Sequence, residues 1–512
     1  MKVFVVGNRC HVERALVSSE LFFEIKNELT IEVKGFKGTI TEYKYYMIEE
    51  GILWMPRHYG VLKFKERVPD VEIEIDMTVG EDIASPITKN YTLTELQLTY
   101  VKALINNHFS FKLKAIGGEG AIAVLPCGVG KTYIGIDMVR RWKKVTLWIT
   151  NTDVSVKKTA KLIKKTLPTL KVLTFDDTEE QLLACDVLVS TVHRFVLSHS
   201  RFRRDKDLAI QFAKRIGCVI YDEIHTLGGP TFGNVFDLFA PCKQLGLSAT
   251  PTRKDKANLK YMLSVGPCFE MEGIDPPKFP TIAKAIHYYN EPDPSFREWK
   301  YSDEAKKNLN ISATIHNITA DPKRKPLLLK ILAESLRRGQ DTLDNDVTLG
   351  IGESIIIFCG YLDEIDNIMH LISTVDESNL PPEDKLLFKD IKVCTVTGKT
   401  PPLGVADAVS NARIIITNYQ KLGTAFSEAR FTTAVLWSST KSYAEQAVGR
   451  IGRYCEEQQE WNKRLRYVYD IVDGGGTLAQ VQFKNHRSEL YKKLGFTTQH
   501  VKWDIETERF TQ

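Results

Sequence analysis

The sequence predicts an α/β protein in which two tandem parallel-sheet domains follow a small β-rich N-terminal domain. From about residue 120, short apolar runs recur roughly every 20–35 residues and alternate with amphipathic stretches, as strand–helix–strand units do. A second series of such runs begins near residue 353. The first 88 residues lack this pattern and combine turn residues with clustered aromatic residues, which indicates a separate domain.

The first series of apolar runs predicts the first parallel sheet. Its members are AIAVLP (121–126), VTLWI (145–149), DVLVS (186–190), CVIY (218–221) and QLGLSAT (244–250). Because each run is apolar at successive positions, both faces of each strand are expected to be covered, as in a parallel sheet. We therefore expect the first parallel-sheet domain at residues 89–288.

The second series predicts another sheet of the same kind. Its members are ESIIIF (353–358), KVCTV (392–396), ARIIIT (412–417), AVLW (434–437) and YVYDIV (467–472). We expect the second domain at residues 326–475, because the glycines at 474–476 interrupt the pattern. Residues 289–325, which contain few apolar runs, are expected to be a linker, and residues 476–512 a C-terminal tail.

The N-terminal domain is expected to span residues 1–88, with SPITKN (85–90) at its boundary. Its aromatic residues suit either a hydrophobic core or stacking on nucleic-acid bases; they are Tyr43, Tyr45, Tyr46, Trp54 and Tyr59. This domain is therefore a candidate accessory, DNA-engaging module, and the segment MPRHYG (55–60) is its candidate contact.

Composition excludes several classes of protein. Of 512 residues, 43% are hydrophobic and 26% charged, which is ordinary for a soluble globular protein, and a net charge of +5 favours polyanions only weakly. No apolar stretch is long enough to span a membrane. The nine cysteines are scattered and form no C-x-x-C pair, which favours buried thiols in a reducing, intracellular compartment.

A glycine-rich loop follows the first apolar run. Cys127 and Gly128-Val129-Gly130-Lys131-Thr132 stand between a predicted strand and a predicted helix. The glycines allow backbone N–H groups to face a phosphate, and Lys131 could reach the β- and γ-phosphates of a nucleotide. The Thr132 hydroxyl could bind Mg²⁺. Leu125 replaces the first glycine of the general pattern, and a chance glycine turn is the alternative.

An acidic pair, Asp222-Glu223, ends the apolar run CVIY. Parallel-sheet folds place ligands at the carboxyl ends of their strands, so Asp222 could hold Mg²⁺ while Glu223 orients the attacking water. His225 could connect this site to a nucleic-acid site. A solvated turn with a structural histidine is the alternative.

These two motifs, in this order, resemble those of superfamily 2 helicases of the DExH type, and LPCGVGKT resembles the XPB-like branch. The resemblance implies two RecA-like domains that bind and hydrolyse ATP with Mg²⁺ in the cleft between them. Further segments resemble the family's motifs, and they assign an adenine contact to Gln97 and nucleic-acid contact or coupling to Asn151, Thr191, Ser248 and Thr250.

The second series contains QAVGRIGR (446–453), which resembles helicase motif VI. The resemblance makes Gln446 a catalytic-site residue and makes Arg450 and Arg453 arginine fingers for the γ-phosphate. Residues 423–427 lack the acid that is common in motif V and resemble the form found in helicases of large DNA viruses. Ser427 is then a candidate for a backbone-phosphate contact or for coupling.

The C-terminal segment NHRSELYKKLGF (485–496) also resembles this viral group, which includes the poxvirus transcript-release helicase and its asfarvirus and iridovirus counterparts. The resemblance implies an ATP-dependent DNA helicase, moving 3′ to 5′, in viral transcription or replication at a cytoplasmic site or in the virion. A duplex DNA translocase that displaces proteins or transcripts, and a nucleotide-gated nucleic-acid-binding scaffold, remain alternatives. RNA remains possible as a partner in place of DNA.

Overall fold

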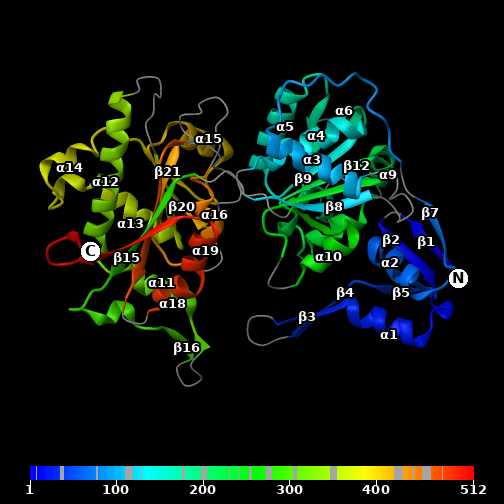
Figure 1. Ribbon diagram of the computed structural model, residues 1–512, viewed down its shortest axis with the longest axis horizontal. Helices are drawn as coiled ribbons and strands as arrows, with labels where there is room; N and C mark the ends of the chain where they lie inside the picture. The colour runs from blue at the N-terminus through cyan, green and yellow to red at the C-terminus, as the bar shows by residue number, and fades with distance from the viewer. Residues whose placement is uncertain are drawn as a thin grey trace. The chain divides into compact units, whose positions relative to one another are not determined.

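The computed structural model divides the chain into two compact units, Met1–Ile274 and Asp275–Gln512 (Figure 1). Each unit has its own sheets and hydrophobic cores. The structure describes residues 1–6, 8–34, 40–76, 79–109, 119–126, 129–175, 179–197, 204–229, 231–239, 241–252, 256–271, 279–303, 308–345, 354–419, 430–440, 443–452, 463–474 and 477–511.

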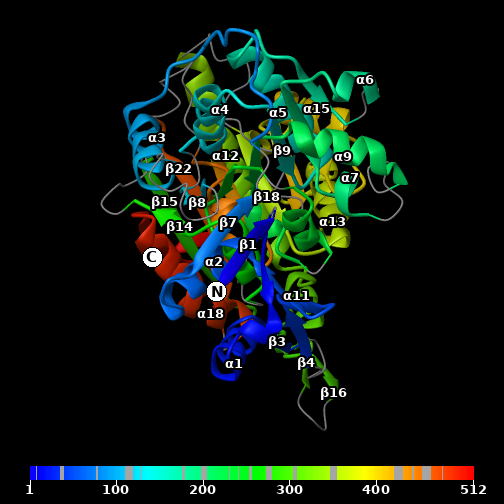
Figure 2. The ribbon, with the colours of Figure 1, turned by 90° about the vertical axis from the view of Figure 1, so that its right-hand side faces the viewer.

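The N-terminal module is β-rich, as predicted, and adds two helices. Its elements are β1 (Lys2–Val6), β2 (Arg9–Glu13), η1 (Arg14–Leu16), α1 (Ser19–Glu28), β3 (Thr30–Lys34), β4 (Ile40–Lys44), β5 (Met47–Glu49), β6 (Ile52–Pro56), α2 (Arg57–Arg67) and β7 (Glu72–Asp76). The sheet has the order β5-β6-β2-β1-β7. The β3–β4 hairpin lies beside α1 (Figure 1 and Figure 2).

Buried polar contacts join this module to the sheet domain that follows it. Asn8 and Gln244 exchange side-chain hydrogen bonds of 3.3 and 2.7 Å, and the Tyr221 hydroxyl donates to the same glutamine at 3.2 Å. The Arg57 guanidinium donates to the carbonyl oxygen of Pro241 at 3.3 Å. Arg57 and His58 are both buried, so these two residues of segment 55–60 have an internal, structural position.

The first parallel sheet has the order β10-β11-β9-β12-β13-β8-β14, and each neighbouring pair of strands is parallel. The strands are β8 (Glu119–Val124), β9 (Thr146–Thr150), β10 (Val172–Thr174), β11 (Val187–Thr191), β12 (Cys218–Asp222), β13 (Lys243–Ser248) and β14 (Cys268–Glu270). The helices are α3 (Glu95–His108), α4 (Lys131–Trp142), α5 (Asp153–Thr166), α6 (Glu179–Leu182), α7 (His193–Val196), α9 (Lys206–Arg215), η3 (Ile224–Thr226), η4 (Phe232–Asp237) and α10 (Asn258–Ser264).

Helices cover both faces of this sheet, which explains the continuous apolar runs. One hydrophobic core joins the sheet to α3, α4 and α5, and a second core joins the opposite face to α7, α9, η4 and α10. Figure 1 shows α3, α4 and α5 on one side of the sheet and α10 on the other. All five runs of the first predicted series are strands.

The second unit contains an eight-stranded sheet of order β19-β20-β18-β21-β22-β15-β23-β24, in which only the β23–β24 pair is antiparallel. The strands are β15 (Thr281–Tyr288), β18 (Ser354–Cys359), β19 (Val393–Val396), β20 (Ile414–Asn418), β21 (Phe431–Leu436), β22 (Arg466–Asp473), β23 (Thr497–Asp504) and β24 (Arg509–Thr511). All five runs of the second predicted series are strands here.

The remaining elements of the second unit are a short strand pair and the helices around the sheet. The strand pair is β16 (Tyr301–Asp303) and β17 (Asn308–Leu309), and the longer helices are α11 (Ile311–Thr319), α12 (Arg324–Asn345), α13 (Leu362–Ser373) and α15 (Pro402–Asn411). The short helices are η5 (Pro294–Arg297), η7 (Val375–Glu377), α14 (Pro382–Leu386), α16 (Ala444–Val448), α18 (Leu478–Gln482), η9 (Phe483–Arg487) and α19 (Ser488–Lys493).

The domain boundaries differ from those expected from the sequence. We expected the first sheet domain to reach residue 288, but β15 pairs in parallel with β22 and with β23 and so belongs to the second unit. The expected linker, 289–325, contains α11, and the expected tail, 476–512, supplies β23 and β24. Strand β15 escaped the prediction because its buried and half-buried positions partly alternate, unlike the continuous runs.

Two further observations bear on the expectations from composition. Among the described residues, no helix combines the length and apolar character needed to cross a membrane. Seven cysteines fall in the described part of the chain, and all of them are free thiols. Four of the seven are buried, as expected, whereas Cys242, Cys268 and Cys394 are partly exposed.

Candidate ATP-hydrolysis site

The predicted site residues of the first unit gather at one edge of its sheet. Strand register pairs Thr191 with Thr150, and Asp222 with Leu247, the residue before Ser248. Since all these strands are parallel, their carboxyl ends meet at a single edge, where open α/β sheets bind ligands. Topology alone therefore brings the carboxyl ends of β9, β11, β12 and β13 together.

The phosphate loop enters α4 through a left-handed glycine. Gly130 has φ 82° and caps the helix, which begins at Lys131. The backbone conformation favours glycine, and a Cβ atom at this position would lie 2.4 Å from the Gln97 side-chain nitrogen, which would have to shift. The N-terminal end of α4 offers N–H groups to an anion. Cys127 and Gly128, also predicted for this loop, lie outside the described residues.

Gln97 ties α3 to this loop. Its side-chain nitrogen donates to the carbonyl oxygen of Val129 at 3.0 Å, and its side-chain oxygen accepts from the Thr94 backbone N–H at 2.9 Å. The Thr94 hydroxyl in turn accepts from the Gln97 backbone N–H, which completes a capping box. The spacing of Thr94 and Gln97 could have revealed this cap. The predicted adenine contact of Gln97 stays a prediction.

Glu223 lies between two cationic or polar partners. One carboxylate oxygen is 3.1 Å from the Lys131 ammonium, and the other is 3.5 Å from the Nδ1 atom of His225. Its backbone is left-handed, with φ 49°, a conformation that costs a side-chain-bearing residue roughly 1–3 kcal/mol. Such strain at a polar strand end is typical of functional positions.

Asp222 ends β12 beside Glu223. Burial, followed by the neighbouring Glu223 carboxylate, raises the pKa of Asp222 to about 7, while Lys131 acts in the opposite direction. Two adjacent carboxylates in a site that disfavours negative charge form a donor set that a divalent cation would stabilise. Thr132 is the second residue of α4, the helix that Lys131 begins.

His225 connects the acidic pair to β13. Its Nδ1 atom lies 2.8 Å from the Ser248 hydroxyl oxygen, and that oxygen accepts from the Thr250 backbone N–H at 3.1 Å. A continuous series of polar contacts therefore runs from Lys131 through Glu223 and His225 to Ser248. A displacement at either end can be transmitted to the other through these contacts.

The residues expected to contact nucleic acid occupy neighbouring strand ends. Asn151 directly follows β9, and Thr191 ends β11, the strand paired with β9. The Thr191 side chain is largely buried, whereas Asn151 is partly exposed. Their contact with nucleic acid stays a prediction.

The second unit holds the other predicted site residues. Gln446 lies in α16, and Arg450 follows that helix, with its backbone N–H donating to the Ala447 carbonyl oxygen at 3.0 Å. Both residues are half-buried. Arg453 and Ser427 lie outside the described residues, so their predicted roles stay predictions.

Comparisons with known proteins support a helicase. Residues 90–253 match the family described as "Type III restriction enzyme, res subunit". The chain is 23% identical over 500 residues to "Putative ATP-dependent RNA helicase L396" of Acanthamoeba polyphaga mimivirus, a match that covers 95% of this chain and 85% of the relative.

Two more similarities concern the XPB-like branch and the fold. The chain is 27% identical to "DNA 3'-5' translocase XPB2" of Sulfurisphaera tokodaii, over 48% of this chain and 52% of that protein. Its fold is similar to a fragment described as "a putative HsdR subunit of a type I restriction enzyme" from Vibrio vulnificus, with a TM-score of 0.50, 16% identity and coverage of 82% and 70%. The fold is therefore the predicted pair of RecA-like parallel-sheet domains with a small β-rich N-terminal domain. Together these findings confirm the resemblance seen in the motifs: the chain is similar to ATP-dependent helicases and translocases of superfamily 2, among them an XPB translocase and a viral helicase.

Proposed function

We propose that this protein is a DNA helicase that hydrolyses ATP at the carboxyl edge of its first RecA-like sheet, moves 3′ to 5′ and separates strands. The series of contacts Lys131–Glu223–His225–Ser248 carries the proposal. It links a phosphate-binding lysine, a carboxylate and a strand end of the same sheet. Such a link allows the presence of the γ-phosphate to change the protein's conformation.

Each residue of the site has a defined task in this proposal. Lys131 binds the β- and γ-phosphates of ATP, and the left-handed turn at Gly130 directs backbone N–H groups at them. Glu223 accepts a proton from, and orients, the attacking water. Exchange of Lys131 from Glu223 to the phosphate would leave the carboxylate available to that water.

Mg²⁺ suits the donors next to the phosphate loop. Thr132 and Asp222 would hold it, and it would neutralise charge on the phosphate oxygens. The raised pKa of Asp222 fits this role, because a bound cation stabilises the ionised carboxylate. The resemblance assigns Arg450 and Arg453 to stabilisation of the γ-phosphate charge in the transition state, and Gln446 to the catalytic site.

DNA is the proposed track because the XPB2 relative is named as a DNA translocase that moves 3′ to 5′. The mimivirus relative is named as an RNA helicase, which makes RNA the competing outcome. Because that relative is a viral protein, we also propose a role in viral transcription or replication, at a cytoplasmic site or in the virion.

ATP turnover of the purified chain with single-stranded DNA, duplex DNA and RNA tests the proposal. We expect DNA to stimulate turnover strongly, and we expect both Lys131→Ala and Glu223→Gln to lose the stimulated activity. If only RNA stimulates turnover, RNA and not DNA is the track. Absence of turnover with every polymer would overturn the motor and leave a nucleotide-gated scaffold.

A duplex translocase that does not unwind is the second candidate, because the XPB2 relative is named a translocase. Displacement of a labelled strand from a duplex reports unwinding, whereas displacement of a third strand from a triplex reports translocation alone. The helicase proposal predicts both activities. Triplex displacement without strand separation would favour the translocase.

A further inference from the structure

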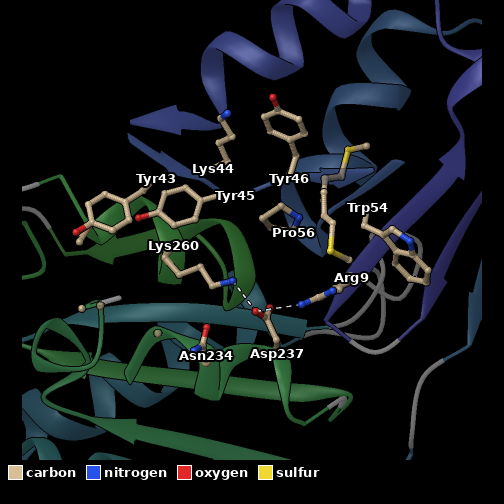
Figure 3. A pocket seen from close by; sticks show the side chains of 16 residues that line it. Arg9, Tyr43, Lys44, Tyr45, Tyr46, Trp54, Pro56, Asn234, Asp237 and Lys260 are labelled. Carbon is tan, nitrogen blue, oxygen red and sulfur yellow. Dashed lines mark hydrogen bonds and ion pairs between the residues drawn. The ribbon is translucent and has the colours of Figure 1, made fainter. Parts of the chain in front are cut away.

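A pocket lies between the N-terminal module and the sheet domain within the first unit (Figure 3). Its volume is about 410 Å³, which falls in the usual range for small-molecule sites, roughly 300–1,000 Å³. One wall comes from β2, β4, β5 and β6 with the residues between β4 and β5, and the other comes from the segments around η4 and the start of α10.

Aromatic side chains gather on the N-terminal wall. Tyr43, Tyr45, Tyr46 and Trp54 line the pocket, and Figure 3 shows their side chains around it. The Trp54 ring is backed by His11, with ring centroids 4.5 Å apart. Planar rings fixed in this way offer stacking surfaces to another aromatic ring.

The charged side chains that line the two walls of the pocket carry a net positive charge. The Asp237 carboxylate lies 2.7 Å from the Lys260 ammonium and 3.5 Å from the Arg9 guanidinium (Figure 3). One carboxylate cannot neutralise two cations, so this group retains a positive charge. Lys44 also lines the pocket. The pocket therefore combines stacking surfaces with a preference for an anion.

We propose that this pocket binds a single unpaired nucleotide of the nucleic-acid strand, with its base against the tyrosines and its phosphate toward Lys44 and the Arg9–Asp237–Lys260 group. A nucleotide is the ligand class that joins a flat ring to an anion at this size. The proposal rests on the proposed function as a nucleic-acid motor and assigns that motor a second contact, outside the carboxyl edge of the sheet.

The pocket's second wall continues directly from the candidate ATP-hydrolysis site. Gly228 and Gly229 follow η3, which contains His225, and α10 follows the segment of Ser248 and Thr250. A Cβ atom at Gly228 would lie 2.9 Å from both the Ala257 carbonyl oxygen and the Tyr261 ring, so the two segments pack closely. A strand held in the pocket would thus contact the segment that follows the acidic pair and the segment that follows β13.

Binding of single-stranded DNA by the full chain tests the pocket through Tyr43. This residue is chosen because Tyr45 and Tyr46 also pack against the module's hydrophobic core, whereas Tyr43 does not. We expect Tyr43→Ala to weaken binding by about 5-fold to 100-fold, the range for loss of one stacked base. Tyr43→Phe, which keeps the ring, should bind like the unchanged protein.

Two matched controls isolate the stacking contact. Phe23→Ala removes an aromatic ring that is 64% exposed on the same module but does not line the pocket, and it should leave DNA affinity unchanged. On a strand of abasic residues, Tyr43→Ala should have no effect. Melting temperatures of the variants establish that each one is folded before binding is compared.

An unchanged affinity of folded Tyr43→Ala, or an equal loss on abasic DNA, would overturn the pocket proposal. Excess thymidine monophosphate should weaken DNA binding by the unchanged protein to the level of Tyr43→Ala, because a free nucleotide competes for the same pocket. DNA-stimulated ATP turnover of the unchanged protein is measured in parallel. If DNA stimulates turnover but the pocket does not bind a nucleotide, the motor function is retained and only the pocket proposal fails. If DNA does not stimulate turnover, the motor function itself is overturned.

Discussion

Two strands of this chain, β12 in the first unit and β22 in the second, both carry carboxylates within or at the end of a buried parallel strand, but their surroundings differ. At the end of β12, the Glu223 carboxylate faces Lys131 and His225, side chains that a ligand can draw away. On β22, Asp470 accepts from the Arg487 guanidinium at 2.8 Å and from the Tyr491 hydroxyl at 2.7 Å.

Solvent exposure distinguishes the carboxylates at β12 from those on β22 as clearly as their contacting side chains do. The Glu223 side chain is 33% exposed, whereas the side chains of Asp470 and Arg487 are each 1% exposed. Burial raises the pKa of Asp473, at the end of β22, to about 6, and Arg324 counteracts that rise. An acidic strand end is therefore a ligand site where its partners are replaceable and a structural element where a buried arginine neutralises it.

Replacement of Lys131 by alanine should have the largest functional effect. The lysine is the cation of the phosphate loop, and loss of one charged contact to a transition state costs about 100-fold or more in rate. We expect ATP turnover to fall by at least that factor while the unfolding temperature changes little. Lys161→Ala, an exposed lysine on α5, serves as the control in the same turnover assay.

Replacement of Arg487 by methionine should have the largest effect on folding. It leaves the buried Asp470 carboxylate without its cation, which costs about 3–5 kcal/mol of unfolding free energy. Chemical denaturation measures this loss. Lys492→Met, at an exposed ion pair with Glu489, should unfold like the unchanged protein. If Arg487→Met and Lys492→Met had similar stabilities, the carboxylates of β22 would not have the structural role that distinguishes them from those at β12.

His225→Ala should have an intermediate effect, on coupling. The histidine contacts both Glu223 and Ser248, so its loss should lower nucleic-acid stimulation about 10-fold and basal turnover less. Ser248→Ala should produce the same change, and the double variant should be no worse than either single one. Additive losses would indicate that the two side chains act separately.

Asp222→Asn, measured without ATP and Mg²⁺, should produce a pH-dependent change in stability. Because the folded-state pKa of Asp222 is raised to about 7, the folded protein binds more protons than the unfolded chain between about pH 4 and pH 7. The contribution of this carboxyl to the stability of the folded protein therefore falls as pH rises through that window. We expect the melting temperature of the variant to exceed that of the unchanged protein by an amount that grows toward pH 7. A constant difference would contradict the raised pKa.

Much of the fold could be predicted because ten of the strands are short, mostly apolar runs. The strands that escaped lie near the sheet edges or combine exposed and buried positions, as β23 does with its largely exposed residues. Their pairing depends on segments far apart in sequence: β15 lies between β22 and β23. The sequence pattern within a strand does not show which distant strand will pair with it.

The site was predictable to the extent that its motifs are local. Lys131 and Glu223 were assigned from their own sequence surroundings, and the structure brings their side chains together. The contact of His225 with Ser248 depends on the register of β12 with β13, which the sequence does not report. The same holds for the hydrogen bonds between Asn8 and Gln244, which join residues in different domains of the sequence analysis.

ATP turnover per folded molecule, with and without DNA, in Glu223→Gln and in Asp470→Asn tests the central distinction most directly. We predict that Glu223→Gln keeps the melting temperature of the unchanged protein and loses about 100-fold or more of its turnover. Asp470→Asn should melt earlier but, while folded, should turn over ATP normally. Normal turnover in Glu223→Gln, or a folded but inactive Asp470→Asn, would contradict the assignment of β12 as the catalytic strand.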